Sequence, residues 1–421
     1  MANLLGLPGW EAFQPWAIVS MAVAASVLVP VWQRITGSLP VATGIALVTT
    51  CIILAMNSEE PYAAIVAMGI PAMLVLASRI AKGDKFALAS GIIYLGVSAT
   101  FYTLFTGAIA LSAVAVCIVM AAIVQRSIKP LLWLAVLGGG SIVIALISWG
   151  PYLLASVNGA ERSGDSATHY LPLEGTQFPV PFLASSVVGL LCLVGLIYLV
   201  VRFHNNEVRA MWVGIAVFYA WMGMSMAITL LGNTLLGFRL DTVLVLIFAT
   251  AGVLGIADFR LASVYQLYPT QITERTANYL TNFIVVLVLL GGLYYAQDLP
   301  QKNARAIDLA YTDTDGYGQR ADLYPAGAAR YYKDINDHLL DQGFEPSETV
   351  VLTDELDFMS YYPYRGYQAF TSHYANPLGE FGNRNAFIED LAIRSWDELA
   401  DPQQFSDALN TSPWTIPEVF I

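Results

Sequence analysis

The chain has 421 residues, of which 56% are hydrophobic and only 12% are charged. Soluble globular chains carry about 25% charged residues, so this composition excludes an ordinary soluble protein and indicates a membrane protein. The net charge of -12 is uneven, because residues 298–421 hold 21 acidic and 8 basic residues. The acidity of this C-terminal part argues against nucleic acid as a partner.

Ten apolar stretches are long enough to cross a hydrocarbon core, which takes about 20 mostly apolar residues. In chain order they are 15–33, 39–56, 61–78, 86–105, 107–125, 130–150, 182–202, 211–231, 238–257 and 280–296. Between residues 86 and 125 we expect the junction of two spans near Thr106 and Gly107. The sequence therefore predicts an α-helical polytopic membrane domain of about ten transmembrane helices over residues 1–297.

Lys and Arg residues are distributed unevenly between the predicted loops. Loops after odd-numbered spans hold ten of them, and loops after even-numbered spans hold only Arg162 and Arg239. Because positive charge is retained on the cytoplasmic side, we predict a multi-pass plasma-membrane protein whose even loops and both ends are extracytoplasmic. An outward N-terminus with no signal peptide, and an apolar run that stops at Ile421, indicate a fragment that lacks upstream helices.

Two regions outside the predicted spans are large enough to carry function. The loop 151–181 exceeds the about 12–15 residues of a simple connection. Residues 298–421 have the pattern of a soluble extracytoplasmic α/β domain, cut off before its end. Its predicted helices are near 326–340, 385–395 and 403–409, and its predicted strands are at 349–353 and near 367–371.

Several common catalytic motifs are missing from the sequence. It contains no Walker loop, no GxGxxG after a strand and no HExxH, and its four histidines lack metal-ligand spacing. The three cysteines all lie in apolar stretches. We therefore expect neither ATP-driven nor zinc-dependent activity, and we assign no cofactor.

Three acidic residues and one arginine are candidates on the predicted outer face. Glu59 and Glu60 lie between two spans, where adjacent carboxylates could take a proton or hold a divalent cation. The alternative is a solvated hairpin with acidic residues before Pro61. Arg239 lies in a short loop with Asp241, and its guanidinium suits a phosphate. The alternative there is an arginine that is neutralised by Asp241.

The densest aromatic signal is the segment 358–381, in which 8 of 24 residues are Phe or Tyr. Aromatic rings offer apolar faces with a polar rim, which suit a carbohydrate. The candidate sugar contacts are Tyr364, Arg365, Tyr367, His373, Tyr374 and Asn376. The alternative is that these rings anchor the domain at the lipid headgroups. In the long loop, His169 is a further candidate donor or base.

Six stretches together resemble the actinobacterial galactan 5-O-arabinofuranosyltransferases. They are LPGWEAFQPWAI at 7–18, EEPY at 59–62, ATFYT at 99–103, HYLP at 169–172, FRL at 238–240 and YYPYRGYQAFTSHYANPLGEF at 361–381. The resemblance covers essentially the whole chain and implies a GT-C membrane glycosyltransferase with a soluble C-terminal domain. It implies transfer of arabinofuranose from decaprenyl-phosphoryl-arabinose to the galactan of the cell wall, which starts arabinan synthesis.

The resemblance also implies that the catalytic acidic residue lies in a loop upstream of the matched residues. We therefore name no catalytic base, and we expect the chain alone to be inactive. For the donor phosphate we favour Arg239, with His169 as a second candidate, because a departing phosphate needs positive charge. Two alternatives stay open: a transporter for a lipid-linked sugar, and a noncatalytic scaffold for cell-wall assembly.

Overall fold

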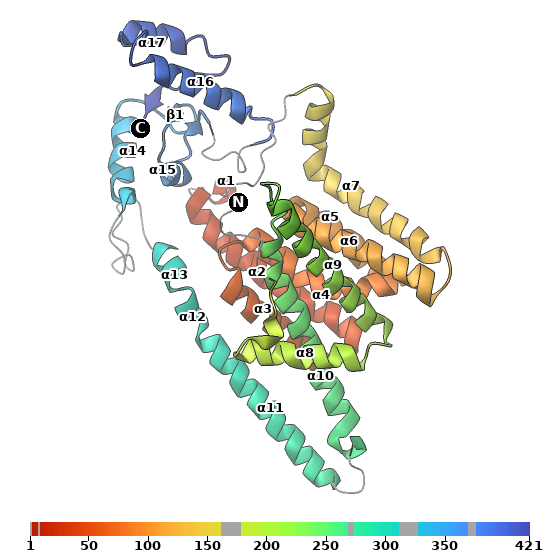
Figure 1. Ribbon diagram of the computed structural model, residues 1–421. Coiled ribbons are helices and arrows are strands. Elements are labelled where there is room, and N and C mark those ends of the chain that lie inside the picture. Colours follow the sequence, from red (N-terminus) through yellow and green to blue (C-terminus); the bar gives the residue numbers. More distant parts are fainter. Residues whose placement is uncertain (1, 7–8, 161–177, 268–272, 311–326, 369–375) are drawn as a thin grey trace. The chain divides into compact units, whose positions relative to one another are not determined.

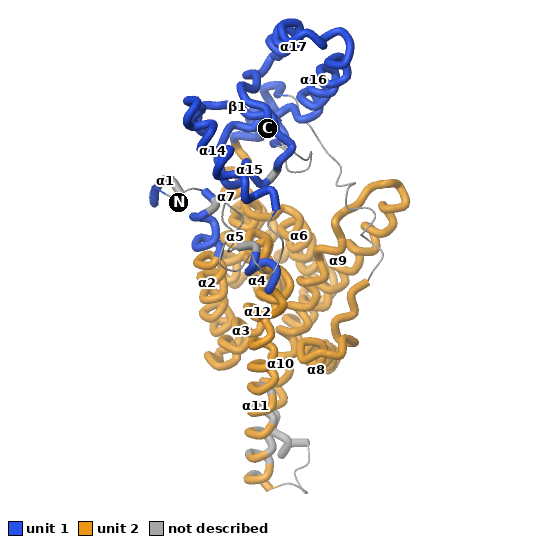
Figure 2. Tube along the Cα trace, turned by 90° about the vertical axis from the view of Figure 1, so that its left-hand side faces the viewer, with its two compact units in different colours: residues 1–17, 151–166, 304–421 blue, residues 18–150, 167–303 orange. Residues whose placement is uncertain are grey.

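The structure is a computed structural model that describes residues 2–6, 9–160, 178–267, 273–310, 327–368 and 376–421. Contacts divide the chain into two compact units, coloured separately in Figure 2. Unit 1 contains residues 1–17, 151–166 and 304–421, and unit 2 contains residues 18–150 and 167–303. Unit 2 ends at Asn303, close to residue 298, where the polar C-terminal part was predicted to start.

Unit 2 is a bundle of long helices (Figure 1). Its elements are α2 (Gly9–Thr36), α3 (Leu39–Met56), α4 (Pro61–Ile80), α5 (Lys85–Phe101), α6 (Thr103–Val119), η1 (Met120–Val124), α7 (Lys129–Val157), η3 (Pro181–Leu183), α8 (Val187–Val201), α9 (Asn206–Thr229), η4 (Gly237–Leu240), α10 (Asp241–Leu267), α11 (Glu274–Gln297) and α12 (Leu299–Lys302). The first residues of α2 and the last residues of α7 belong to unit 1.

Helices long and apolar enough to cross a membrane number seven within the described residues. They are α2, α3, α4, α6 with η1, α7, α9, and η4 with the first part of α10, while α5 and α8 are apolar but shorter. Each of the ten predicted spans falls largely on one of the observed helices. The prediction of a helical membrane protein is confirmed, and the count of ten crossings stays a prediction.

The junction between α5 and α6 lies at Tyr102, and the prediction of a break near Thr106 and Gly107 was wrong. Tyr102 is extended, with φ -149° and ψ 101°, so the helical hydrogen bonding stops at this one residue. No Gly or Pro marks the break, and both flanking sequences are apolar. The sequence pattern therefore gave no local signal for it.

The long connection after α7 starts later than predicted. Pro151 lies inside α7, which continues to Val157, so the first residues of the expected loop 151–181 are helical. Proline removes one backbone hydrogen bond, but an apolar helix tolerates this loss when the remaining ladder continues. Residues 161–177, including the candidate His169, lie outside the described residues.

The core of unit 2 is built around α4 and the first half of α10, which are largely buried, whereas α7 is largely exposed. α10 packs closely on α8 at two glycines. A Cβ atom on Gly195 would clash with the carbonyl oxygen of Phe248, and one on Gly252 would clash with that of Leu191. Small residues of this kind let helix backbones approach each other in membrane proteins, which fixes α10 and the short η4 before it.

Capping residues set where several helices of unit 2 begin. The Asp84 carboxylate accepts hydrogen bonds from the backbone of Phe86 and Ala87 at the start of α5. Asn205 does the same for Glu207 at the start of α9. Pro61 opens α4, where a missing N–H costs nothing. These residues fix the turns that connect the predicted spans.

Unit 1 contains a small mixed region near the C-terminus. Its elements, after the short α1 (Ala2–Leu5), are α13 (Ala304–Ala310), η6 (Ala328–Tyr331), α14 (Tyr332–Asp341), β1 (Val350–Leu352), α15 (Leu356–Tyr361), β2 (Arg365–Gly366), α16 (Phe381–Arg394), α17 (Pro402–Leu409) and β3 (Val419–Phe420). The strands form a parallel sheet in the order β2-β1-β3, with Val351 opposite both Gly366 and Val419.

Three details of this region differ from the predictions. Residues 367–368 of the strand expected near 367–371 are not in a strand: β2 covers only Arg365–Gly366, and residues 369–375 lie outside the described part of the chain. α15 was not predicted, and four of its six residues belong to the aromatic segment 358–381. The expected helix near 326–340 starts as a 3-10 turn at Ala328.

Candidate functional site

The candidate site of unit 2 is centred on an ion pair between Arg239 and Glu60. The Nη1 atom of Arg239 donates to both carboxylate oxygens of Glu60, at 2.6 Å each. The side chains are 13% and 30% exposed, so most of the pair is shielded from solvent. The alternative in which Asp241 neutralises Arg239 was wrong, because the paired carboxylate comes from a residue 179 positions earlier.

The turn between α3 and α4 positions Glu60. α3 ends at Met56, and Pro61 opens α4. The carbonyl of Glu60 accepts hydrogen bonds from the backbone of Ala63 and Ala64, which fixes this residue at the helix start. Its neighbour Glu59 is exposed. The two adjacent carboxylates therefore have different surroundings, and among the described residues only that of Glu60 is paired with a cation.

The predicted proton or divalent-cation role of Glu59 and Glu60 stays a prediction. Within the described residues, no group of three or more His, Cys, Asp or Glu side chains could hold a metal ion. Both oxygens of Glu60 accept from Arg239, so a divalent cation would have to compete with the guanidinium. Asp241 is the first residue of α10 and is partly buried.

Aromatic rings lie close to the ion pair. The guanidinium of Arg239 lies 5.4 Å from the ring of Phe238. Tyr102 makes edge contacts with Tyr62 at 5.4 Å and with Phe105 at 4.7 Å. The hydroxyl oxygen of Tyr102 is buried, and the charges of Arg239 and Glu60 act on it. Apolar rings exclude water, which strengthens electrostatic interactions at the pair.

Sequence reasoning missed Tyr102 as part of this site. Tyr102 lies in the ATFYT stretch, but nothing in that stretch indicates that the helix is interrupted at this residue. The extended backbone of Tyr102 turns the chain from α5 into α6. A tyrosine at a helix break beside an arginine could have been found only from the fold.

The arrangement has the chemistry of an anion site. Arginine keeps its charge in low-dielectric surroundings, and its planar fork matches phosphate oxygens. A buried ion pair adds little stability, since the desolvation of two charges offsets most of their attraction. An anionic ligand that displaced Glu60 would find a cation already held in place by Phe238 and the start of α10.

Three rings of the aromatic segment of unit 1, those of Phe358, Tyr364 and Tyr367, are buried in the part that the structure describes. Tyr364 and Tyr367 are 5% and 2% exposed. The hydroxyl of Tyr364 donates to Asn336 Oδ1 at 3.1 Å, and its ring stacks on Phe358. Burial raises the pKa of the Tyr364 hydroxyl. The rings of these two tyrosines therefore have little surface left for a sugar.

Two other candidates of this segment are exposed, and two cannot be placed. Arg365 and Asn376 are both exposed to solvent. His373 and Tyr374 lie outside the described residues. The sugar-contact role of the whole set stays a prediction. Because Arg365 and Asn376 are exposed, they are the residues of the set to test first.

An arginine that was not among the candidates organises the buried part of this segment. Arg384 donates to the carbonyl oxygen of Tyr367 at 2.7 Å and lies over the rings of Tyr367 and Trp414. The hydroxyl of Tyr367 is 2.9 Å from Ser412 Oγ. This packing holds the residues after β2 against the C-terminal end of the chain.

Comparison with known proteins gives matches over both parts of the chain. The family model "Arabinofuranosyltransferase N terminal" matches residues 1–292, and "Arabinofuranosyltransferase A C terminal" matches residues 299–421. A Corynebacterium glutamicum protein named galactan 5-O-arabinofuranosyltransferase is 98% identical over the whole chain, which covers 64% of that relative. A relative of the same name from Mycolicibacterium smegmatis is 38% identical, and the whole chain covers 67% of it. Another, from Mycobacterium tuberculosis, is 35% identical, and the whole chain covers 64% of it.

The chain thus spans about two thirds of the length of the curated relatives it matches. The Glu60–Arg239 pair and the helices that hold it all lie within the residues that the first family model matches. The chain belongs to the arabinofuranosyltransferase family whose N-terminal and C-terminal models it matches.

Proposed function

We propose that this chain is part of an enzyme that transfers arabinofuranose to cell-wall galactan. The observation that carries the proposal is the match of both family models, together with the 98% identity to a protein named galactan 5-O-arabinofuranosyltransferase. Seven helices that could cross a membrane fit a multi-pass plasma-membrane enzyme. In the proposal, the Glu60–Arg239 end and residues 298–421 are extracytoplasmic.

The proposed donor is decaprenyl-phosphoryl-arabinose, whose phosphate would lie at Arg239. The lipid tail keeps this phosphate at the membrane surface, and the Arg239 guanidinium lies at the start of a membrane helix. A phosphate that leaves carries its negative charge with it. Positive charge fixed at that oxygen stabilises the transition state more than the ground state. His169 stays a second candidate for the same group.

The proposed reaction is a direct displacement that inverts the anomeric centre. A galactan hydroxyl oxygen forms the new bond to the anomeric carbon of arabinose, while the bond from that carbon to the phosphate oxygen breaks. The electron pair leaves on decaprenyl phosphate, and a carboxylate takes the hydroxyl proton. In this chain the candidate carboxylates are Glu59, Glu60 and Asp241, and Glu60 would first have to leave Arg239.

For the acceptor, we propose contacts from the exposed part of the aromatic segment. Arg365 is at the edge strand β2, and Asn376 follows the segment. Their polar groups are exposed and could bind galactan hydroxyls. His373 and Tyr374 complete the proposed set. The buried rings of Tyr364 and Tyr367 would hold this segment in position by packing.

The test is a transfer assay in proteoliposomes, with a protein of the relatives' full length that carries this chain. Labelled decaprenyl-phosphoryl-arabinose and a galactan oligosaccharide are supplied, and arabinose on the oligosaccharide is measured. We expect transfer that depends on both substrates. Donor movement across the bilayer without product would favour the transporter, and acceptor binding without product would favour the scaffold.

A further inference from the structure

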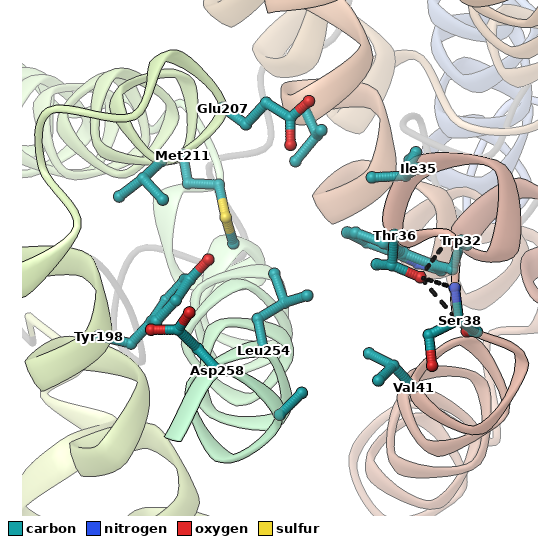
Figure 3. A pocket seen from close by; sticks show the side chains of 13 residues that line it. Trp32, Ile35, Thr36, Ser38, Val41, Tyr198, Glu207, Met211, Leu254 and Asp258 are labelled. Atoms are coloured by element: carbon teal, nitrogen blue, oxygen red, sulfur yellow. Dashed lines mark hydrogen bonds between the residues drawn. The ribbon is translucent and has the colours of Figure 1, made fainter. Parts of the chain in front are cut away.

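A second polar region of unit 2 is a cavity whose charged side chains are already paired. The cavity measures about 270 Å³ and lies among α2, α3, α4, α8, α9 and α10, toward the end of α4 away from Glu60. Two of its lining residues, Glu207 and Asp258 in Figure 3, accept hydrogen bonds from Arg79 and Arg202. Among the residues that the structure describes, no buried side-chain N or O atom of this lining lacks a hydrogen-bond partner. The buried polar atoms that lack a partner therefore lie elsewhere in the chain.

The hydroxyl oxygen of Tyr102 is such an atom, and it lies at the candidate site. It is shielded from solvent and makes no hydrogen bond with any described residue. The guanidinium of Arg239 and the carboxylate of Glu60 are near enough for their charges to act on it. Burial of a hydroxyl without a hydrogen bond is unfavourable, so the few such groups in a native protein call for an explanation, such as a catalytic role or a bound ion.

Contacts on both sides of the helix break hold Tyr102 in place. Thr106 Oγ1 donates to the carbonyl oxygen of Tyr102 at 2.9 Å and lies 3.0 Å from Ser98 Oγ, so the start of α6 is tied to the end of α5. The Tyr102 ring is in edge contact with the rings of Tyr62 and Phe105. The hydroxyl is therefore held in position without a ligand, as a preorganised binding group must be.

We propose that the Tyr102 hydroxyl is a second ligand of the anion at Arg239 and donates a hydrogen bond to a phosphate oxygen of the polyprenyl phosphate. This inference rests on the proposed function, in which Arg239 binds that phosphate. A hydroxyl has one proton to donate, and a hydrogen bond to a charged oxygen is about twice as strong as one between neutral groups. When the phosphate displaces Glu60 from Arg239, the hydroxyl gains the partner that it lacks.

The chemistry of the proposed reaction gives this second donor a use. A phosphodiester has two oxygens that carry charge, and the phosphate that leaves has three. The site therefore gains one charged acceptor as the bond from the anomeric carbon to the phosphate oxygen breaks. A donor that is already fixed beside Arg239 stabilises the charge that develops there.

The test measures two properties of Tyr102→Phe in a purified protein of the relatives' full length, in detergent. The first is the Kd for decaprenyl phosphate, and we expect binding to weaken at least about tenfold, as loss of a hydrogen bond to a charged group predicts. The second is the melting temperature without ligand, which should stay the same or rise, because the variant removes a hydroxyl that has no partner in the free protein.

A matched control comes from the same helix. The hydroxyl of Tyr94, in α5, donates to the carbonyl oxygen of Val66 at 2.6 Å. Tyr94→Phe also removes one buried tyrosine hydroxyl, but one that already has a partner. We expect it to lower the melting temperature and to leave the Kd for decaprenyl phosphate unchanged. Equal weakening of binding in both variants would overturn the role of Tyr102.

The variant Arg239→Ala separates a failure of this inference from a failure of the proposed function. Weak binding in Arg239→Ala with unchanged binding in Tyr102→Phe would overturn the role of Tyr102 and keep that of Arg239. Unchanged binding in both would overturn the phosphate site itself. A Tyr102→Phe protein that unfolds more easily or does not fold would also contradict the inference, because its hydroxyl would then stabilise the fold.

Discussion

The two ends of the helical bundle both hold arginine–carboxylate pairs, but the pairs differ in exposure. At one end, the side chains of Arg239 and Glu60 are 13% and 30% exposed. At the other end, those of Arg202 and Asp258 are 49% and 37% exposed. Water screens the exposed pair, which joins α8 to α10 through two well-aligned hydrogen bonds.

The contrast shows which pair needs an explanation beyond stability. Burying two charges costs several kcal/mol per ion, and apolar residues of similar size would often be as stable. The Arg239–Glu60 pair is nonetheless kept among the rings of Phe238 and Tyr102. The proposed role of Arg239 in binding an anion would account for a charge at this partly buried position.

The largest expected effect concerns the sides of the membrane on which the two ends lie. Glu59 and Lys82 flank α4 at its two ends and are both exposed. We expect a membrane-impermeant thiol reagent on intact cells to label Glu59→Cys and not Lys82→Cys, and to label both after permeabilisation. Labelling of Lys82→Cys alone would invert the predicted topology.

The next effect concerns the stability of the buried pair. We expect Arg239→Ala to lower the free energy of unfolding by about 3 kcal/mol, because it leaves the Glu60 charge partly buried without its cation. The double variant Arg239→Met with Glu60→Leu should recover most of this loss. Chemical unfolding in detergent measures both. A double variant as unstable as the single one would show that the charges themselves hold the bundle together.

A smaller effect separates buried from exposed side chains in the aromatic segment. Tyr364→Phe removes the hydroxyl that donates to Asn336, so we expect a loss of about 1 kcal/mol in stability. The KM for the galactan acceptor should stay unchanged. Arg365→Ala should raise that KM and leave stability and the KM for the donor unchanged. The reverse pattern would move the acceptor contact to the tyrosine.

The smallest effect is a pH dependence in the C-terminal region. Burial, and the hydrogen bond that Tyr332 donates to Glu355, raise the pKa of the Tyr332 hydroxyl. Above about pH 10 the unfolded chain loses this proton first, so stability that is present below pH 10 falls as the pH rises. We expect Tyr332→Phe to flatten this fall. Unfolding measured at several pH values up to 11 would show it, and an unchanged slope would exclude Tyr332 as its source.

Long-range pairing explains most of what could not be predicted from the sequence. Apolar runs located the helices, because each span must be apolar to cross lipid. The partner of Arg239 could not be found in the same way, since Glu60 is 179 residues away and Asp241 is a nearer carboxylate. The burial of the Tyr364 ring could not be predicted either, because composition does not reveal that this ring stacks on Phe358 of α15.

The most direct measurement of the central claim is the rate of arabinose transfer in matched variants from the two ends of the bundle. We expect Arg239→Ala to lower the rate at least about 100-fold, as loss of one charge-stabilising group does in other enzymes. Arg239→Lys should recover only part of it, because a point charge does not replace the guanidinium fork. Arg202→Ala, in the exposed pair, should leave transfer nearly unchanged. Full transfer by a folded Arg239→Ala protein would contradict the account.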